Sequence, residues 1–215
     1  MKTGILFDLD GTLLDTLEDL KDATNATLRH FGCPERTLEE IRSFVGNGAR
    51  NQIRMSLPGK ADDPDLEEVL AWYQEYYPRH CQIKTAPYAG ILEALEELGK
   101  KYPLAIVSNK PDSAVKILCA DFFPGVYAQG VTDDCPRKPA PDMVLRAMEA
   151  IGVDRCIYVG DSEVDIRTAR NANVPCVSVL WGFRDRKVLE EEGGDCFCSD
   201  PAELCTIVEE LRHGE

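Results

Sequence analysis

The sequence of 215 residues predicts an α/β fold, in which helices pack on both sides of a doubly wound parallel sheet. From Tyr88 onward, helical segments alternate with short apolar runs, a pattern typical of right-handed βαβ units. Between Thr16 and Lys84, apolar residues recur only at helical spacing. We therefore expect a sheet-containing core of residues 1–15 and 85–215 and an all-helical insertion of residues 16–84.

The expected elements follow from the spacing of apolar residues along the chain. A first strand begins at Ile5, and the insertion should hold helices around 17–28, 38–45 and 66–73. The linkers between insertion and core are expected near 14–17 and 84–90, the second with loop character. The rest should alternate in this order: helix 91–98, strand from 104, helix 114–120, strand 126–131, helix 143–151, strand around 157, helix 165–171, strand 177–180 and helix 202–211.

Two aspartates, Asp8 and Asp10, end the first apolar strand and are followed by a glycine turn. In an extended segment both side chains tend toward one side, at the carboxyl end of the sheet, where open α/β folds bind ligands. Two close carboxylates either share a proton or hold a cation, and oxygen ligands of this kind suit Mg2+. A calcium-binding EF-hand loop is excluded, because leucines fill later ligand positions and Asp19 replaces the required Glu.

Three further polar groups follow in chain order. A second apolar strand ends in Ser108 and Asn109, and Lys138 precedes a Pro-rich helix start. A third strand ends in Asp161, and Asp165 lies four residues later on the same helical face. Each feature alone could be ordinary: a turn, a solvated charge or a helix cap. Their combination at successive strand ends indicates one shared site.

These four segments resemble the four motifs of the haloacid dehalogenase-like superfamily, and the whole chain resembles its phosphoglycolate phosphatase group. The motifs are DLDGT at 8–12, SN at 108–109, KP at 138–139 and GDSEVD at 160–165. Additional matches to the group are FVGNGA at 44–49, SNKP at 108–111 and WGFRD at 181–185. The resemblance implies that the insertion is a small cap domain and that the protein is a phosphatase.

The resemblance also assigns catalytic roles. Asp8 would attack phosphorus and form an aspartyl phosphate, while Asp10 would first protonate the leaving alcohol and then activate water. Ser108 and the backbone of Asn109 would bind phosphoryl oxygens, and Lys138 would neutralise their charge. Because the dehalogenases of the superfamily lack an aspartate at the place of Asp10, this residue favours phosphoryl transfer.

A magnesium site and a phosphate cradle are implied in the same way. The carboxylates of Asp8 and Asp161 and the backbone carbonyl of Asp10 would hold Mg2+, with Asp165 a direct or water-mediated ligand. Gly11 and Thr12 would let backbone amides approach the phosphate.

The insertion contributes the predicted substrate contacts. Gly46, Asn47 and Gly48 form a turn that could be either a simple helix end or a substrate-contacting loop, and the resemblance favours the loop. Arg50, which follows this turn, could bind a substrate carboxylate or could be a solvated surface charge. With such an anchor, 2-phosphoglycolate is the expected substrate.

Two alternative functions share these residues. A phosphomutase of the same superfamily would use the same catalytic groups and differ in its cap. A signalling receiver, which is a non-enzymatic phosphate acceptor, also clusters acids, a hydroxyl and a lysine, but it is much shorter. The helical insertion from 16 to 84 argues against a receiver.

Composition excludes several other classes. The formal net charge of −14 repels nucleic acid and anionic membranes, so neither is an expected partner. The resemblance implies a small phosphorylated metabolite as the partner, and we expect a monomer or homodimer. An odd number of cysteines, nine, without a C-x-x-C pair predicts neither a zinc ribbon nor a disulfide framework. Cys156 and Cys176 should be buried in strands, and Cys196 and Cys198 would share one side of a strand. Without a targeting signal or a long apolar segment, we expect a cytoplasmic protein.

Overall fold

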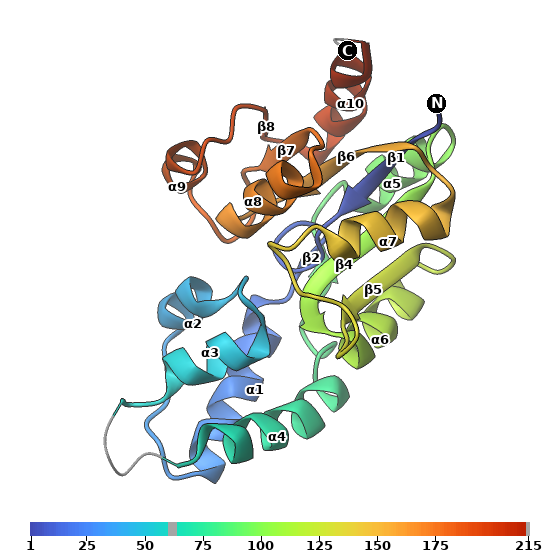
Figure 1. The fold of residues 1–215 in the computed structure, drawn as a ribbon. Coiled ribbons are helices and arrows are strands. Elements are labelled where there is room, and N and C mark those ends of the chain that lie inside the picture. The colour runs from blue at the N-terminus through green and yellow to red at the C-terminus, as the bar shows by residue number, and fades with distance from the viewer. Residues whose placement is uncertain (60–63, 214–215) are drawn as a thin grey trace.

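The computed structural model describes residues 1–59 and 64–213. Within these residues, six strands form a parallel sheet in the order β5-β4-β1-β6-β7-β8. Their bounds are β1 Thr3–Phe7, β4 Leu104–Pro111, β5 Tyr127–Val131, β6 Arg155–Gly160, β7 Cys176–Val179 and β8 Phe197–Cys198. The predicted α/β fold with a parallel sheet is confirmed, and helices flank the sheet on both sides (Figure 1).

Helices α7 and α8 cover one face of this sheet, and α5, α6 and α10 cover the other. Side chains of the central strand alternate between the two: Leu6 packs with the α7 and α8 side, whereas Ile5 and Phe7 pack with the opposite side. The helices are α5 Ile91–Gly99, α6 Asp112–Phe122, α7 Asp142–Ile151, α8 Glu163–Ala172, the short α9 Arg186–Glu191 and α10 Leu204–His213, with a 3-10 turn η2 Pro201–Glu203.

The direction of chain crossover reverses at β1, which places a ligand-binding crevice at its carboxyl end. After β1 the chain builds β4 and β5 on one side, then returns to build β6, β7 and β8 on the other. Phe7 pairs with Ile106 of β4 and Val159 of β6, so the residues that follow these three positions lie at one level. In open α/β sheets, this switch point is where ligands bind.

The helical insertion, residues 16–84, lies beside this carboxyl edge (Figure 1). It contains α1 Leu17–His30, α2 Leu38–Phe44, α3 Gly48–Ser56 and α4 Leu66–Tyr76, followed by a 3-10 turn η1 Tyr77–Arg79. Helix α3 was not predicted, because its buried face consists of Gln52, Ile53 and Ser56 and carries little apolar signal. Apolar side chains of the insertion and of β1 belong to one continuous hydrophobic cluster.

The two linkers are more regular than predicted. Strand β2, Leu14–Asp15, pairs antiparallel with β3, Ala86–Pro87, so the chain leaves and re-enters the core through a short ribbon. Beside it, the buried carboxylate of Asp19 accepts the backbone N–H groups of residues 83, 84 and 85, each at 2.9 Å. Two-residue strands have no periodic pattern, so sequence spacing cannot reveal them.

Candidate active site

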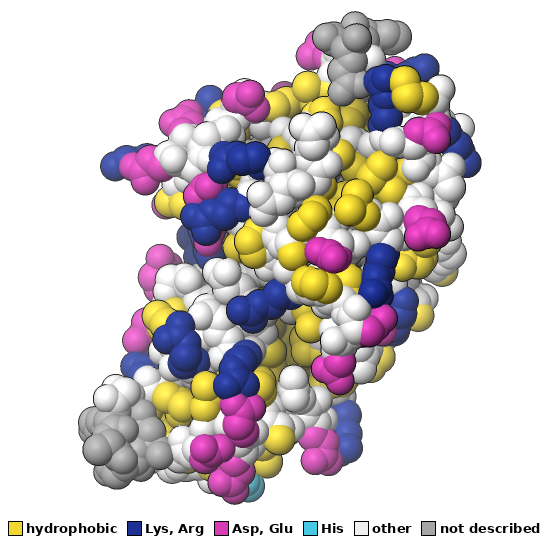
Figure 2. Space-filling model, viewed as in Figure 1, with side chains coloured by type: hydrophobic (Ala, Val, Ile, Leu, Met, Phe, Trp, Pro, Cys, Tyr) yellow, Lys and Arg dark blue, Asp and Glu magenta, His cyan; other side chains and the backbone are white. Residues whose placement is uncertain are grey.

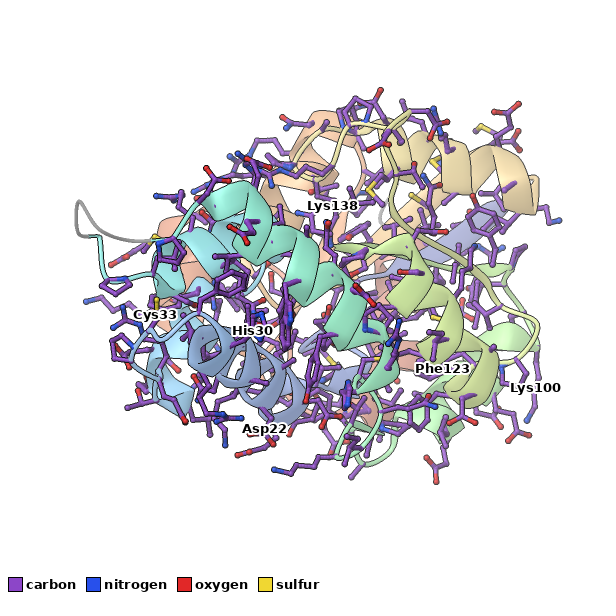
Figure 3. All side chains as sticks on the ribbon, turned by 90° about the horizontal axis from the view of Figure 1, so that it is seen from below. Asp22, His30, Cys33, Lys100, Phe123 and Lys138 are labelled. Carbon is purple, nitrogen blue, oxygen red and sulfur yellow. The ribbon has the colours of Figure 1, made fainter. Side chains whose placement is uncertain are left out.

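The predicted site residues meet at the carboxyl edge of the sheet. Asp8 and Asp161 directly follow β1 and β6, Ser108 lies in β4, Lys138 lies between β5 and α7, and Asp165 lies in the first turn of α8. All five are buried. Figure 3 shows Lys138 inside the molecule, in contrast to the peripheral Lys100. One prediction needs correction: β4 does not end at Ser108 and Asn109 but continues to Pro111.

Lys138 connects two of the acidic residues. Its Nζ donates to Asp8 Oδ1 and to Asp165 Oδ1, both at 2.8 Å, and to the Tyr158 hydroxyl at 3.0 Å. Burial works against the charged ammonium, but Asp165 and Asp8 outweigh it and raise the pKa of Lys138 well above its usual value. The neighbouring carboxylates therefore favour the charged form of this lysine beside Asp8.

Both carboxylate oxygens of Asp165 accept hydrogen bonds. Its Oδ2 accepts the Ser162 backbone N–H at 3.1 Å and the Ser162 hydroxyl at 2.6 Å, which forms a capping box at the start of α8. Its Oδ1 accepts from Lys138. Asp165 thus takes part in a helix cap and also contacts Lys138.

Asp161 is fixed by two segments that are distant in sequence. The backbone N–H of Phe183 donates to its Oδ2 at 2.7 Å, and the Thr12 hydroxyl donates to its Oδ1 at 3.3 Å. A Cβ on Gly11 or Gly182 would overlap the Asp161 side chain. Gly11 also has a φ of +84°, which a glycine adopts readily. Both glycines therefore allow the backbone to approach this carboxylate closely.

The acidic cluster could hold a metal ion. Among the residues that the structure describes, Asp8, Asp161 and Asp165 each offer a carboxylate oxygen within 4.8 Å of the others. Burial, with Asp165 and Asp10 adding to it against Lys138, raises the pKa of Asp8 to about 7. Burial, then Asp165 and Asp8, raises the pKa of Asp161 well above its usual value. Lys138 alone does not balance these charges, and an all-oxygen donor set fits a hard divalent cation.

The Asp10 side chain lies outside this group. Its Oδ1 accepts from the Thr16 hydroxyl at 2.6 Å and from Lys110 Nζ at 2.5 Å. Lys110 also donates to the Tyr77 hydroxyl at 2.7 Å. Sequence analysis did not single out Lys110, although it stands in the SNKP match, directly after Asn109.

A cavity of about 40 Å³ lies between the sheet edge and the insertion. Asp8, Asp10 and Ser108 line it from the sheet, and Gly46 and Gly48 line it from the insertion. Further lining comes from Leu20, Gln52, Tyr73, Tyr77, Lys110 and Arg184. The volume is on the order of three times the minimum for one water molecule, so the cavity can admit solvent or a polar group of a ligand.

Of the predicted substrate residues in the insertion, the structure places two away from this lining. Asn47 accepts a hydrogen bond from Arg137 through its backbone carbonyl, at 3.0 Å. The side chain of Arg50 is 51% exposed and pairs with Glu67. Neither residue belongs to the cavity wall. For Arg50 the solvated-charge interpretation describes the structure better than the substrate anchor.

One side chain from β4 and one from the loop after β7 hold the turn between α2 and α3. Asn109 Nδ2 donates to the Gly46 carbonyl at 3.1 Å and to the Lys138 carbonyl at 3.0 Å. Arg184 Nη2 donates to the Val45 carbonyl at 2.7 Å. Figure 2 shows Lys and Arg side chains on both sides of the boundary between insertion and sheet. The insertion is thus fastened over the site.

Comparison with known proteins places this chain in a family. Residues 5–179 match the model of the haloacid dehalogenase-like hydrolases. The chain is 31% identical to a phosphoglycolate phosphatase of Pseudomonas putida, covering 95% of this chain and 83% of that one. It is 35% identical to a phosphoglycolate phosphatase of Rhodobacter capsulatus, covering 86% and 87%.

A solved structure agrees over nearly the whole length. A candidate phosphoglycolate phosphatase from Lactobacillus delbrueckii subsp. bulgaricus superposes with a TM-score of 0.85 and 36% identity, covering 97% of this chain and 99% of that one. The chain therefore belongs to the haloacid dehalogenase-like hydrolases. Within that family it is a phosphatase of the phosphoglycolate phosphatase-like group.

The structure also bears on the cysteines and on membrane segments. None of the nine cysteines, all of which the structure describes, forms a disulfide bond, and Cys156 is buried as predicted. Cys176 is only half-buried, which corrects the prediction, because it is the first residue of β7, whose other three residues are buried. Among the described residues, no helix combines the length and apolar character that crossing a membrane requires.

Proposed function

We propose that this chain is a Mg2+-dependent phosphate-monoester hydrolase that acts through an aspartyl-phosphate intermediate on a small phosphorylated metabolite, with 2-phosphoglycolate as the best candidate. The observation that carries the proposal is the contact between Lys138 and Asp8 inside a buried acidic cluster. A carboxylate held by a lysine is poised as a nucleophile, and the same lysine can neutralise an incoming phosphoryl group.

The chain's own groups account for both half-reactions. Asp8 attacks phosphorus, the ester oxygen leaves, and Asp10 supplies the proton to it. Asp10 then accepts a proton from the water that hydrolyses the aspartyl phosphate. Ser108 and nearby backbone N–H groups bind the phosphoryl oxygens, and Lys138 balances their charge.

Asp8 and Asp161 would hold the metal ion, together with the Asp10 backbone carbonyl. Asp165 would act directly or through water, although its contacts to Lys138 and Ser162 favour an orienting role. When bound, Mg2+ offsets the negative charge of the cluster and draws the anionic phosphate toward an anionic nucleophile.

The helical insertion would act as a cap domain that excludes water from the site. Its support is the closed position of the α2–α3 turn, held by Asn109 and Arg184, and the two-stranded ribbon on which the insertion is carried. A phosphomutase of the same superfamily would share these catalytic groups and return the phosphoryl group to a sugar, so phosphate release to water is the observation that distinguishes the two activities.

We further propose a cytoplasmic enzyme, a monomer or homodimer, without nucleic-acid or membrane partners. The support is the net charge of −14, which repels polyanions and anionic lipid surfaces alike.

A substrate screen tests the function. Purified protein with Mg2+ is assayed for phosphate release from 2-phosphoglycolate, sugar phosphates, nucleotides and pyrophosphate, and kcat/KM values are compared. We expect 2-phosphoglycolate to rank first and chelator to abolish release. Equal or higher values for hexose phosphates would reassign the substrate, and full activity in chelator would reject the metal site.

A further inference from the structure

Lys110 is a second buried lysine of the site, and the proposed reaction does not use it. It lies in β4, two residues beyond Ser108, and its side chain is 2% exposed. It lines the same cavity as Asp8, Asp10 and Ser108. A buried lysine whose N–H groups are not all hydrogen-bonded destabilises the folded protein, and such a lysine at a cavity wall is suited to bind an anionic group there.

The two buried lysines differ in how fully they are neutralised. Lys138 contacts two carboxylates, Asp8 and Asp165, and one phenol. Lys110 contacts one carboxylate, Asp10, and one phenol, Tyr77. An ammonium group has three N–H donors, and two acceptors are described for Lys110. One donor is therefore available to an acceptor inside the cavity.

The surroundings of Lys110 strengthen its attraction for an anion. Its Nζ lies 4.8 Å from the centre of the Tyr77 ring, and Leu20, Tyr73 and Tyr77 line this side of the cavity. Apolar and aromatic walls screen charge poorly, so an anion here is attracted more strongly than at the surface.

Other cations near the cavity are already engaged. Arg184 binds Glu163 and two backbone carbonyls, and Arg50 pairs with Glu67 outside the cavity wall. Among the lining residues that the structure describes, Lys110 is a buried cation that lies between Asp10 and Tyr77 of the insertion. It also has one N–H group available for a further acceptor.

We propose that Lys110 is the residue that selects the substrate: its ammonium binds a carboxylate carried on the carbon next to the ester oxygen. The inference rests on the proposed phosphatase function and deepens it. Asp10 is the group that protonates the leaving oxygen, and Lys110 Nζ is 2.5 Å from Asp10 Oδ1. A carboxylate one carbon from that oxygen lies within reach of Lys110, whereas a neutral alcohol gains nothing from it.

Two phosphate esters of similar size, one with and one without a carboxylate, test whether Lys110 recognises the negative charge of the substrate. 2-Phosphoglycolate carries a carboxylate, and 2-hydroxyethyl phosphate carries a hydroxymethyl group at the same place. We expect Lys110→Met to lower kcat/KM for 2-phosphoglycolate about ten- to a hundredfold more than for 2-hydroxyethyl phosphate, the value of a charge-assisted hydrogen bond. Lys110→Arg should restore part of the preference, and Lys100→Met, at an exposed lysine, should leave both rates unchanged.

A binding measurement separates an anchor from a structural role. Calorimetry with 3-phosphonopropionate, in which a carbon replaces the ester oxygen, and with propylphosphonate needs no turnover. Lys110→Met should weaken the binding of 3-phosphonopropionate at least tenfold and the binding of propylphosphonate less than threefold.

The outcomes separate this inference from the function on which it rests. Equal losses for both esters and both phosphonates would mean that Lys110 serves only to position Asp10. No loss for any of them would mean that Lys110 neither binds the carboxylate nor positions Asp10. Each of these results overturns the proposed carboxylate contact, while hydrolysis of the neutral ester still supports the phosphatase function. If wild-type protein with Mg2+ hydrolyses no phosphate ester, the function and the inference both fall.

Discussion

Arg42 of the insertion and Arg184, in the loop after β7, form reciprocal hydrogen bonds between their two segments. Each side chain donates to a backbone carbonyl of the segment that carries the other arginine. Arg184 Nη1 lies 2.9 Å from the Arg42 carbonyl oxygen, and Arg42 Nε lies 2.7 Å from the Phe183 carbonyl oxygen. The N–H of Phe183 binds Asp161 on its other side. The backbone of Phe183 therefore contacts both the insertion, through Arg42, and the carboxylate of Asp161 in the acidic cluster.

Removing Arg184 should loosen the insertion. The side chain is 12% exposed and bonds Glu163, Arg42 and Val45, so we expect Arg184→Ala to cost about 1.5–3 kcal/mol of unfolding free energy. Hydrogen exchange of the amides of residues 45–48 should accelerate. The control is Arg186→Ala, an exposed residue paired with Glu190. Unchanged exchange at 45–48 would show that Arg184 does not hold the turn.

Removing the nucleophile should stop catalysis without unfolding the protein. Asp8→Asn is nearly isosteric, and we expect turnover to fall at least about a thousandfold while circular dichroism stays unchanged. Asp121→Asn, at an exposed position of α6, should keep full activity. Retention of more than a few per cent of activity by Asp8→Asn would disprove the assignment.

Mg2+ should stabilise the folded protein, because it relieves repulsion among buried carboxylates and binds only when they are assembled. We expect the melting temperature to rise with Mg2+ concentration in wild type. The rise should be lost in Asp161→Asn and reduced in Asp165→Asn. A larger loss in Asp165→Asn would identify Asp165, and not Asp161, as the principal ligand.

Metal affinity should fall as the pH falls. Burial raises the pKa of Asp8 to about 7, so below that pH the ion must displace a proton from this carboxyl group. We expect an apparent Kd for Mg2+ about tenfold higher at pH 6 than at pH 8 if one proton is released. Calorimetry in buffers of different ionisation enthalpy measures that proton. An affinity that is constant between pH 6 and 8 would contradict the raised pKa.

Arg50 should be dispensable. Because its side chain is exposed and pairs with Glu67, Arg50→Ala should change KM for 2-phosphoglycolate less than about twofold and stability less than about 1 kcal/mol. Steady-state kinetics on wild type and variant, with Glu67→Ala as the matched partner change, provide the measurement. A tenfold rise in KM in Arg50→Ala alone would return Arg50 to the site.

The sequence by itself determined the features that depend on local pattern. Apolar runs and helical spacing predicted the parallel sheet and the helical insertion. The ends of two apolar runs located Asp8 and Asp161, whereas β4 continues beyond Ser108, and Lys138 was singled out by the Pro-rich helix start that follows it. This works because residues that follow parallel strands are bound to meet at one edge of the sheet. That these residues share one edge of the sheet can be predicted without knowing how their side chains pack.

Only the tertiary structure decided which neighbours each side chain has. Lys110 and Arg50 are both basic residues beside a recognisable motif, yet Lys110 is buried against Asp10 and Tyr77 and Arg50 extends to Glu67. The difference comes from how the insertion packs on the sheet, a contact between segments separated by tens of residues. Spacing along the chain specifies the face of a helix or strand, but the orientation of two packed elements sets which charges lose water and which keep it.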